Sequence, residues 1–163
     1  MKQVVLVRHA KAVPWGYEDD FYRDLTQRGR EDAARVGSRL KSMGIQPGLF
    51  VSSPARRALE TALAFAAVFG YPAEDIEEDP ALYPGYAPHG FLEMLRGLSG
   101  EHDTLFVFGH NPAMEEYAHS LSDRFYGEVP TCSAIVIRFE ADHWGLAEMH
   151  GGRLAGHFTP KDR

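Results

Sequence analysis

The stretch VVLVRHA at residues 4–10 begins as a hydrophobic run and ends in an arginine, a histidine and an alanine. Three valines and a leucine in succession are typical of a central strand that is buried on both faces, as in a parallel sheet between two helix layers. Arg8 and His9 then lie at the carboxyl end of this strand. Because open α/β sheets bind their ligands at that edge, the stretch predicts a central parallel strand with a functional site at its end.

Composition and charge restrict the class of protein. The 163 residues are 44% hydrophobic, which fits one globular domain spanning residues 1–163. The net charge of -6 argues against nucleic acid and anionic membranes as main partners, because both attract a positive surface. No apolar run approaches the roughly 18 residues of a membrane span. No signal segment precedes the first strand, and a single cysteine, Cys132, rules out an internal disulfide. We therefore expect a cytoplasmic protein that binds neither nucleic acid nor membrane.

Strand-like and helix-like patterns alternate along the chain. Strands are predicted at 4–10, 49–54, within 75–83, at 103–112, 133–141 and 145–158, and helices at 27–44, 54–69, 90–98 and 113–123. Thr26 is the expected N-cap of the first helix, which Gly44 closes. The last two strands are expected to form a hairpin through Asp142–Gly145. This alternation predicts an α/β fold, a three-layer α/β/α sandwich with a mostly parallel central sheet.

Three of the predicted strands end in polar or cationic residues. The three endings are VRHA at 7–10, SSPARRA at 52–58 and GHNPA at 109–113. Pro54 and Pro112 are expected at the first position of the following helices, where free amides and the helix dipole favour an anion. Each ending alone is more often a surface pair, a helix cap or a turn. Their coincidence at three strand ends favours a shared anion site.

The side chains at these ends suit phosphate. Arginine carries a planar, permanently charged fork that matches phosphate oxygens, and Arg8 lies at the first strand end. One of Arg56 and Arg57 is expected to face solvent, and helix spacing alone does not decide which. His9 and His110 supply groups that can work near neutral pH. The sequence therefore predicts a phosphate-sized pocket that contains a nucleophile.

These motifs resemble the histidine phosphatase superfamily, whose first branch includes the cofactor-dependent phosphoglycerate mutases. The resemblance rests on VRHA, on SSPxxRAxxTA from Ser52 to Ala62, and on GHNP, and it spans about residues 4–112. RHAKA…W…RDLTQRG, from Arg8 to Gly29, together with the short chain, is similar to SixA-type phosphohistidine phosphatases. The resemblance implies a phosphoglycerate mutase-like fold and a histidine phosphatase domain.

The resemblance also implies roles for individual residues. The family pattern places the functional arginine directly before Ala-x-x-Thr, which selects Arg57 over Arg56. His9 is implied to be the nucleophile that forms a phosphohistidine intermediate, and Arg8, Arg57 and His110 are implied to hold the phosphoryl oxygens. The catalytic residues are thus expected to be His9, Arg8, Arg57 and His110.

The chemistry is consistent with these roles. A neutral imidazole can attack phosphorus and later release the phosphoryl group to water, provided that its other nitrogen donates to a group such as a backbone carbonyl. The cations stabilise charge on the equatorial oxygens, so neither a metal nor a cofactor is expected. His143, His150 and His157 do not suggest a metal site, because odd separations along one strand would alternate between its faces.

The leaving group is the open question. Phosphomonoesterases and mutases of the superfamily generally use a carboxylate near the third strand to protonate the leaving oxygen. Candidates in or near that region are Glu77, Glu78, Asp79, Tyr83 and His89, and no motif selects one of them. A protonated phosphoimidazole leaves readily without a dedicated acid, whereas an alkoxide needs one. The expected substrate is therefore a phosphorylated protein bearing phosphohistidine. The alternatives are a phosphomonoesterase of a small metabolite and a non-catalytic phosphate-binding module.

The loop at 11–24 follows the expected nucleophile directly. It carries four aromatic residues, Trp15, Tyr17, Phe21 and Tyr22, that either contact the substrate or pack the loop onto the sheet. Arg23 and Asp24 are expected to pair within the fold.

Overall fold

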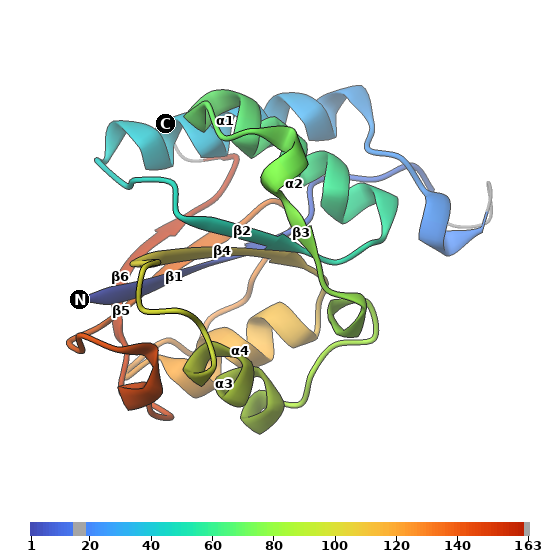
Figure 1. Cartoon of the computed structure of the whole chain (residues 1–163). Coiled ribbons are helices and arrows are strands. Elements are labelled where there is room, and N and C mark those ends of the chain that lie inside the picture. Colours follow the sequence, from blue (N-terminus) through green and yellow to red (C-terminus); the bar gives the residue numbers. More distant parts are fainter. Residues whose placement is uncertain (15–18, 162–163) are drawn as a thin grey trace.

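The central sheet is mixed, with β1 in its interior (Figure 1). The computed structural model describes residues 1–14 and 19–161. Within these residues six strands form one sheet in the order β3-β2-β4-β1-β5-β6. The strands are β1 (Lys2–Arg8), β2 (Leu49–Ser52), β3 (Glu77–Glu78), β4 (Thr104–Gly109), β5 (Ala134–Phe139) and β6 (Arg153–Phe158). The first four in chain order pair in parallel, and β5 and β6 add an antiparallel edge. The expected α/β fold is confirmed.

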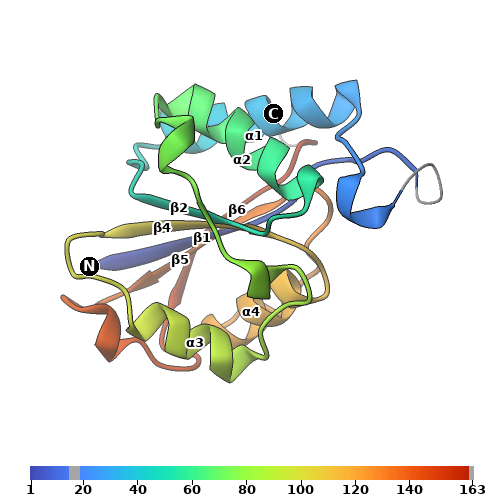
Figure 2. The same cartoon turned by 45° about the vertical axis from the view of Figure 1, so that its right-hand side comes forward.

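Helices cover both faces of this sheet. One layer contains α1 (Gln27–Ser42) and α2 (Arg56–Phe69), and the other contains α3 (Pro88–Arg96) and α4 (Ala113–Leu121), as Figures 1 and 2 show. Short 3-10 turns are η1 (Asp20–Tyr22), η2 (Ala73–Asp75), η3 (Pro80–Leu82) and η4 (Trp144–Leu146). Thr26 caps α1 as expected, since its Oγ1 accepts from the Gly29 N–H at 2.9 Å. No helix in the described part of the chain is long and apolar enough to cross a bilayer.

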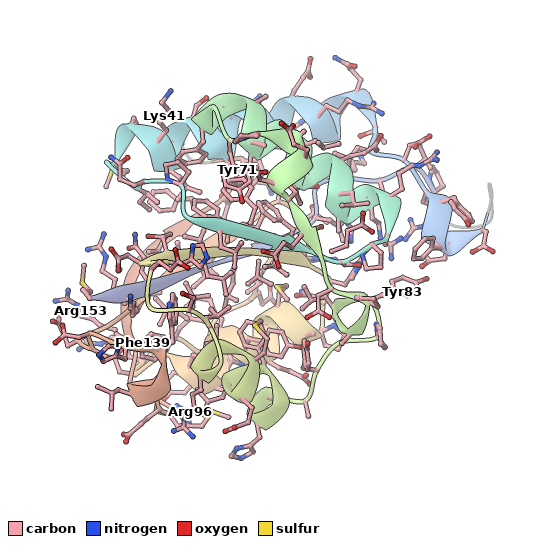
Figure 3. All side chains as sticks on the ribbon, in the orientation of Figure 1. Lys41, Tyr71, Tyr83, Arg96, Phe139 and Arg153 are labelled. Atoms are coloured by element: carbon pink, nitrogen blue, oxygen red, sulfur yellow. The ribbon has the colours of Figure 1, made fainter. Side chains whose placement is uncertain are left out.

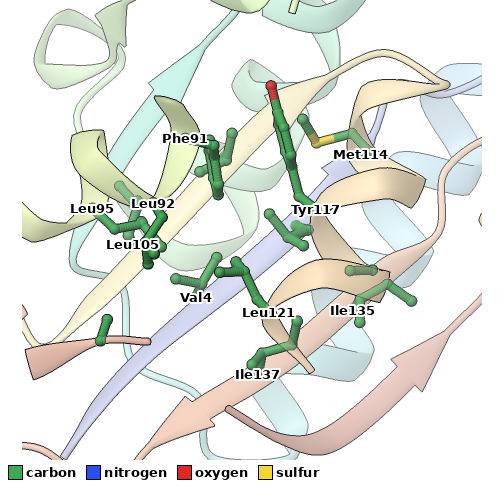
Figure 4. Packing of buried hydrophobic residues seen from close by; sticks show 14 of the residues in the cluster. Val4, Phe91, Leu92, Leu95, Leu105, Met114, Tyr117, Leu121, Ile135 and Ile137 are labelled. Atoms are coloured by element: carbon green, nitrogen blue, oxygen red, sulfur yellow. The ribbon is translucent and has the colours of Figure 1, made fainter. Parts of the chain in front are cut away.

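β1 contributes side chains to two separate cores. Val4 and Leu6 pack under α3 and α4, whereas Val5 and Val7 pack under α1 and α2, and all four are fully buried. Figure 4 shows part of the first core, in which Val4 lies among residues of β4, β5, α3 and α4. A strand that is covered on both faces must be apolar at successive positions, which explains the hydrophobic run at its start.

One helix begins later than expected, and neither proline takes the first helical position. Pro54 and Pro112 precede the helices instead of taking their first position, because α2 begins at Arg56 and α4 at Ala113. Before α2, the Ser53 Oγ accepts from the Ala55 N–H at 3.2 Å, and this turn holds Ala55 in extended backbone as the N-cap. Pro112 itself is the N-cap of α4.

The expected hairpin through Asp142–Gly145 is wrong. β5 and β6 are antiparallel neighbours, but residues 140–152 connect them. Trp144 is buried in this connection, where its indole N–H donates to the His102 carbonyl oxygen at 2.7 Å, so packing draws the chain away from the sheet. His143 and His150 lie in the connection and His157 in β6, so the three histidines do not share one strand as we supposed.

We predict that Phe106→Ala lowers the free energy of unfolding by about 3–5 kcal/mol, because it removes a fully buried ring and leaves a cavity. The ring centroid of Phe106 lies 4.7 Å from that of Phe50 and 5.3 Å from that of Phe69. Urea denaturation measures the change. Tyr126→Ala is the control, since Tyr126 is 76% exposed and its loss should cost little. Equal losses in the two variants would contradict the prediction.

Candidate active site

The register of the sheet brings three strand ends together. Arg8 pairs with Gly109, and Ser52 pairs with Phe108, so β1, β2 and β4 finish at the same level. The His9 N–H donates to the Gly109 carbonyl at 3.0 Å, which extends the pairing by one residue. As a result His9 and His110 lie with their ring centroids 5.3 Å apart.

His9 is held in one tautomer. Its Nδ1 lies 2.7 Å from the carbonyl oxygen of Ala10. Because a carbonyl only accepts, Nδ1 carries the hydrogen and Nε2 keeps a free lone pair. Burial lowers the pKa of His9 to about 4, against the opposing effect of the Ala10 hydrogen bond, and the charges of Arg57 and Arg8 lower it further. The imidazole is therefore neutral at pH 7, with the hydrogen-bond arrangement that a nucleophilic Nε2 needs.

His110 is neutral for a similar reason. Burial lowers its pKa to about 3, with further lowering by His9 and Arg57. Its Nε2 lies 2.8 Å from Oγ of Ser53, a fully buried hydroxyl that also accepts from the Ala55 N–H. The Ser53 hydroxyl can donate its hydrogen to Nε2, and in that arrangement the hydrogen of His110 lies on Nδ1. Among the described residues, no group pairs with that Nδ1.

The guanidinium of Arg8 is held by a hydrogen bond to the backbone. Its Nη1 donates to the Val129 carbonyl oxygen at 3.1 Å. Burial lowers the pKa of Arg8 below its usual range, although Glu115 opposes this effect. The guanidinium nevertheless remains charged at neutral pH.

Arg57 and Arg56 have different environments. The Arg57 side chain is 7% exposed and donates from Nη1 to the Asp20 carbonyl at 2.7 Å and from Nη2 to Asp20 Oδ2 at 3.1 Å. Arg56 is 49% exposed and pairs with Asp24 at 3.1 Å. The neighbouring arginines are thus separated, and Arg57 is the one that lies with the two histidines, close enough to lower the pKa of both.

Asp20 is a member of this cluster that the sequence did not reveal. Its carboxylate accepts from Tyr83 Oη at 2.7 Å, from Arg57 at 3.1 Å and from Arg23 at 3.0 Å. The Tyr83 hydrogen bond is the main cause of a lowered Asp20 pKa; burial opposes it, and Arg57 adds to it. The only signal available was a run of three acidic residues in the loop, Glu18, Asp19 and Asp20, and nothing local distinguishes Asp20 from the other two.

Thr61, the threonine of the SSPxxRAxxTA motif, forms two hydrogen bonds. Thr61 Oγ1 accepts from the Ala10 N–H at 3.0 Å and donates to the Arg57 carbonyl at 2.8 Å. Thr61 thus ties the backbone after the first strand to helix α2, which carries Arg57.

The five proposed proton donors do not all approach this cluster. Glu77 and Glu78 are exposed on the short edge strand, and His89 is exposed at the start of α3. Asp79 accepts from Tyr86 Oη at 2.5 Å and from the Ala81 N–H, so it caps η3. Tyr83 alone of the five is in contact with the cluster, at the sheet edge that Figure 3 shows on the right; its ring centroid lies 5.6 Å from that of His110.

Two aromatic residues of the loop at 11–24 lie in different environments. The Phe21 ring packs edge-on against Tyr83 with a centroid distance of 5.1 Å, whereas Tyr22 is 51% exposed. Trp15 and Tyr17 lie outside the described residues.

The two charged residues at the end of the loop, Arg23 and Asp24, both form ion pairs within the fold. Arg23 pairs with Asp20 and Asp24 pairs with Arg56, so the two do not pair with each other.

A pocket of about 250 Å³ adjoins His110. Its walls include Tyr83, Tyr86, Asn111, Pro112 and Glu116. The cluster of two neutral imidazoles and two guanidiniums therefore has an adjacent space for the remainder of a bound molecule.

Sequence comparison identifies a family. Residues 4–83 match the model of the Histidine phosphatase superfamily (branch 1). An uncharacterised chloroplastic protein of Arabidopsis thaliana is 29% identical over 174 residues, which cover 98% of this chain and 78% of the plant protein. The mitochondrial serine/threonine-protein phosphatase Pgam5 of Drosophila ananassae is 41% identical over 61 residues, covering 37% of this chain and 21% of that protein.

Structural comparison agrees with this result. The protein histidine phosphatase SixA complexed with tungstate matches with a TM-score of 0.83 at 20% identity, covering 97% of both chains. The SixA from Agrobacterium tumefaciens, described as a putative phosphohistidine phosphatase, matches with a TM-score of 0.79 at 24% identity over 98% of both chains. A mycobacterial glucosyl-3-phosphoglycerate phosphatase with inorganic phosphate matches with a TM-score of 0.66 at 16% identity over the full length of both. These likenesses establish the phosphoglycerate mutase-like fold.

The two buried imidazoles predict a specific pH dependence of stability. Both are neutral in the folded protein, with pKa values lowered to about 4 and about 3, whereas the unfolded chain binds protons near pH 6.5. Protons therefore favour the unfolded state, and the free energy of unfolding should fall between pH 7 and pH 5 by about 2 kcal/mol for each imidazole. Urea denaturation of the wild type and of His9→Gln/His110→Gln at both pH values isolates this contribution.

The double variant should show the smaller loss on acidification. His143→Gln is the matched control, because His143 is exposed and its removal should leave the pH dependence as in the wild type. An unchanged pH dependence in the double variant would contradict the assignment of two buried neutral imidazoles.

Proposed function

Because this chain belongs to branch 1 of the histidine phosphatase superfamily and is a phosphatase, we propose that it removes the phosphoryl group from phosphohistidine in a protein, through a phosphohistidine intermediate on His9. The observation that carries the proposal is the hydrogen bond from His9 Nδ1 to the Ala10 carbonyl. It leaves the lone pair of a neutral Nε2 free on a ring whose centroid lies 5.3 Å from that of His110.

The first step transfers the phosphoryl group to the enzyme. The Nε2 lone pair of His9 attacks phosphorus, and the P–N bond to the substrate imidazole breaks. The electron pair of that bond returns to the substrate nitrogen, and because the other ring nitrogen of the substrate already carries a proton, a neutral imidazole leaves. Two easier displacements replace one difficult displacement in this way.

The second step releases phosphate. Water attacks the phosphoryl group on His9, the P–N bond breaks, and the electron pair returns to Nε2 while the proton of water passes to the phosphate product. In both steps Arg8, Arg57 and the Nδ1–H of His110 stabilise charge on the equatorial oxygens. Since these groups supply the positive charge, the proposed reaction is independent of a metal ion.

The protonation states in the cluster favour a P–N substrate. Asp20 is ionised at neutral pH, with its pKa lowered mainly by the Tyr83 hydrogen bond, so it is a poor proton donor. Tyr83 has a raised pKa for the same reason and already donates its hydrogen to Asp20. A leaving imidazole that brings its own proton needs neither group, whereas an alkoxide needs a donor.

A phosphomonoesterase remains the second candidate, supported by a specific observation. Tyr83 is a protonated hydroxyl near His110, and the adjoining pocket of about 250 Å³ has room for part of a small metabolite. A structural neighbour with the same fold is named a glucosyl-3-phosphoglycerate phosphatase. The third candidate, a phosphate-binding module without turnover, gains less support, because a binding module has no need of a nucleophile in the required tautomer.

We predict release of inorganic phosphate from a phosphohistidine peptide, but little from phosphoserine peptides or sugar phosphates. His9→Ala should abolish this release, because it removes the attacking nitrogen while leaving the phosphate-binding cations. The assays should contain EDTA, which is expected to have no effect. Faster release from the esters would instead support the phosphomonoesterase, and no turnover of any substrate would support the binding module.

The two adjacent arginines provide a matched pair of variants. Arg57→Ala should lower kcat/KM by about 10²–10³-fold, because it removes a preorganised donor beside the transferred phosphoryl group. Arg56→Ala should change kcat/KM little, since Arg56 faces solvent and pairs with Asp24. Steady-state kinetics on the phosphohistidine peptide test both expectations. Similar losses in the two variants would contradict the role assigned to Arg57.

A further inference from the structure

A second pocket lies beside the proposed catalytic cluster and differs from it in composition. We call it the basic pocket; its volume is about 330 Å³, and its walls comprise Lys11, Arg28, Asp32, Pro130, Thr131, Thr159, Pro160 and Lys161. Three of these residues are cationic and one is anionic. A concave site of this charge is unusual on a chain whose net charge is -6.

The sheet places the basic pocket at the same edge as the catalytic cluster. Val7 pairs with Ala134, and Ala134 pairs with Phe158, so the segments after β1, before β5 and after β6 all emerge at one level. After β6, the Pro160 carbonyl oxygen accepts from Arg35 of α1 at 3.2 Å, on the side where β6 contacts α1 (Figure 2). The two sites are therefore neighbours on one face of the molecule.

The chain also connects the two sites directly. Lys11 follows His9 by two residues. Pro130 follows Val129, whose carbonyl anchors Arg8, and Thr131 precedes Cys132, whose N–H donates to the carbonyls of Arg8 and His9. A ligand seated on the phosphate-binding residues could thus extend into the basic pocket without leaving the surface.

The one carboxylate of the basic pocket does not neutralise it. Asp32 is 7% exposed, and its Oδ1 accepts from Arg28 at 3.3 Å and from Arg35 at 3.2 Å. Two guanidiniums therefore share a single carboxylate. Lys11 and Lys161 are exposed, and neither forms an ion pair with any described residue. The pocket has a net positive charge that its own side chains leave uncompensated.

Several other exposed arginines of the protein do have carboxylate partners. Such pairs are Arg30 with Glu60, Arg56 with Asp24, Arg96 with Glu93, Arg124 with Asp123 and Arg153 with Glu140. The basic pocket differs from these sites because its cations outnumber its carboxylates, so an anionic partner would meet unpaired positive charge there.

We propose that the basic pocket binds an acidic segment of the substrate protein, so that glutamate or aspartate side chains near the phosphohistidine contact Arg28, Lys11 and Lys161. This inference rests on the proposed function, since it names a feature of the protein whose phosphohistidine enters the catalytic cluster. The acidic segment supplies carboxylates to the uncompensated cations, and the Thr131 and Thr159 hydroxyls lie in the same walls.

Two peptides test the proposal. The two peptides have equal length. In one the phosphohistidine is flanked by glutamates, and in the other it is flanked by glutamines. The wild type should show a KM for the glutamate peptide that is lower by about three- to tenfold, as expected for a few partly exposed charge pairs. In Arg28→Gln/Lys161→Gln the ratio of the two KM values should move toward one. Lys41→Gln should keep the wild-type ratio, because Lys41 lies on α1 at the end of the molecule away from the site (Figure 3) and donates to the Val68 carbonyl.

A binding measurement separates this inference from the catalytic proposal. Fluorescence anisotropy with the unphosphorylated glutamate peptide should show binding to the wild type that added KCl weakens and that the double variant loses. Such binding without turnover of either peptide would support the basic pocket and refute the proposed function. Equal KM values for the two peptides in the wild type, or a preference that survives in the double variant, would overturn the inference.

Discussion

The pairing of β1 with β4 determines where Arg8, His9 and His110 lie. β1 is buried on both faces, so a slip of one residue in its register would transfer each of its apolar side chains to the opposite core. The same register pairs Arg8 with Gly109 and brings His9 next to His110. The packing of two hydrophobic cores thus fixes the geometry of a polar site at the strand ends, and no separate device is needed to align the histidines.

Burial also controls the protonation of this site. The two imidazoles lie beside two guanidiniums, and desolvation together with these charges keeps both imidazoles neutral. A neutral nucleophile next to permanent cations is the combination that phosphoryl transfer from a dianion requires. Asp20 balances part of the positive charge by accepting from Arg57, Arg23 and Tyr83, and it does so without approaching a pKa at which it could donate a proton.

The charges of the two pockets beside the proposed catalytic cluster differ, and this difference bears on how a substrate would bind. The basic pocket and the catalytic cluster share one edge of the sheet, because the strands that carry them end at one level. The pocket beside His110 is lined by Tyr83, Tyr86 and Glu116, whereas the basic pocket on the side of Lys11 is positive. If the substrate is a protein, as we propose, this difference in charge favours an acidic segment in the basic pocket only.

The sequence by itself determined the strands, most of the helices and the residues at the three strand ends, because hydrophobic runs, caps and motifs are local properties. It did not place the start of α2 correctly, since the Ser53 side chain forms a turn before that helix, and it put Pro112 inside α4, where Pro112 is the N-cap. The choice of Arg57 over Arg56 came from the family motif and not from helix spacing. Only the tertiary structure decided that Asp20 joins the cluster, that Ser53 pairs with His110 and that a connection containing the buried Trp144 replaces the expected tight hairpin. Each of these depends on a contact between residues far apart in the chain, and no local pattern records such a contact.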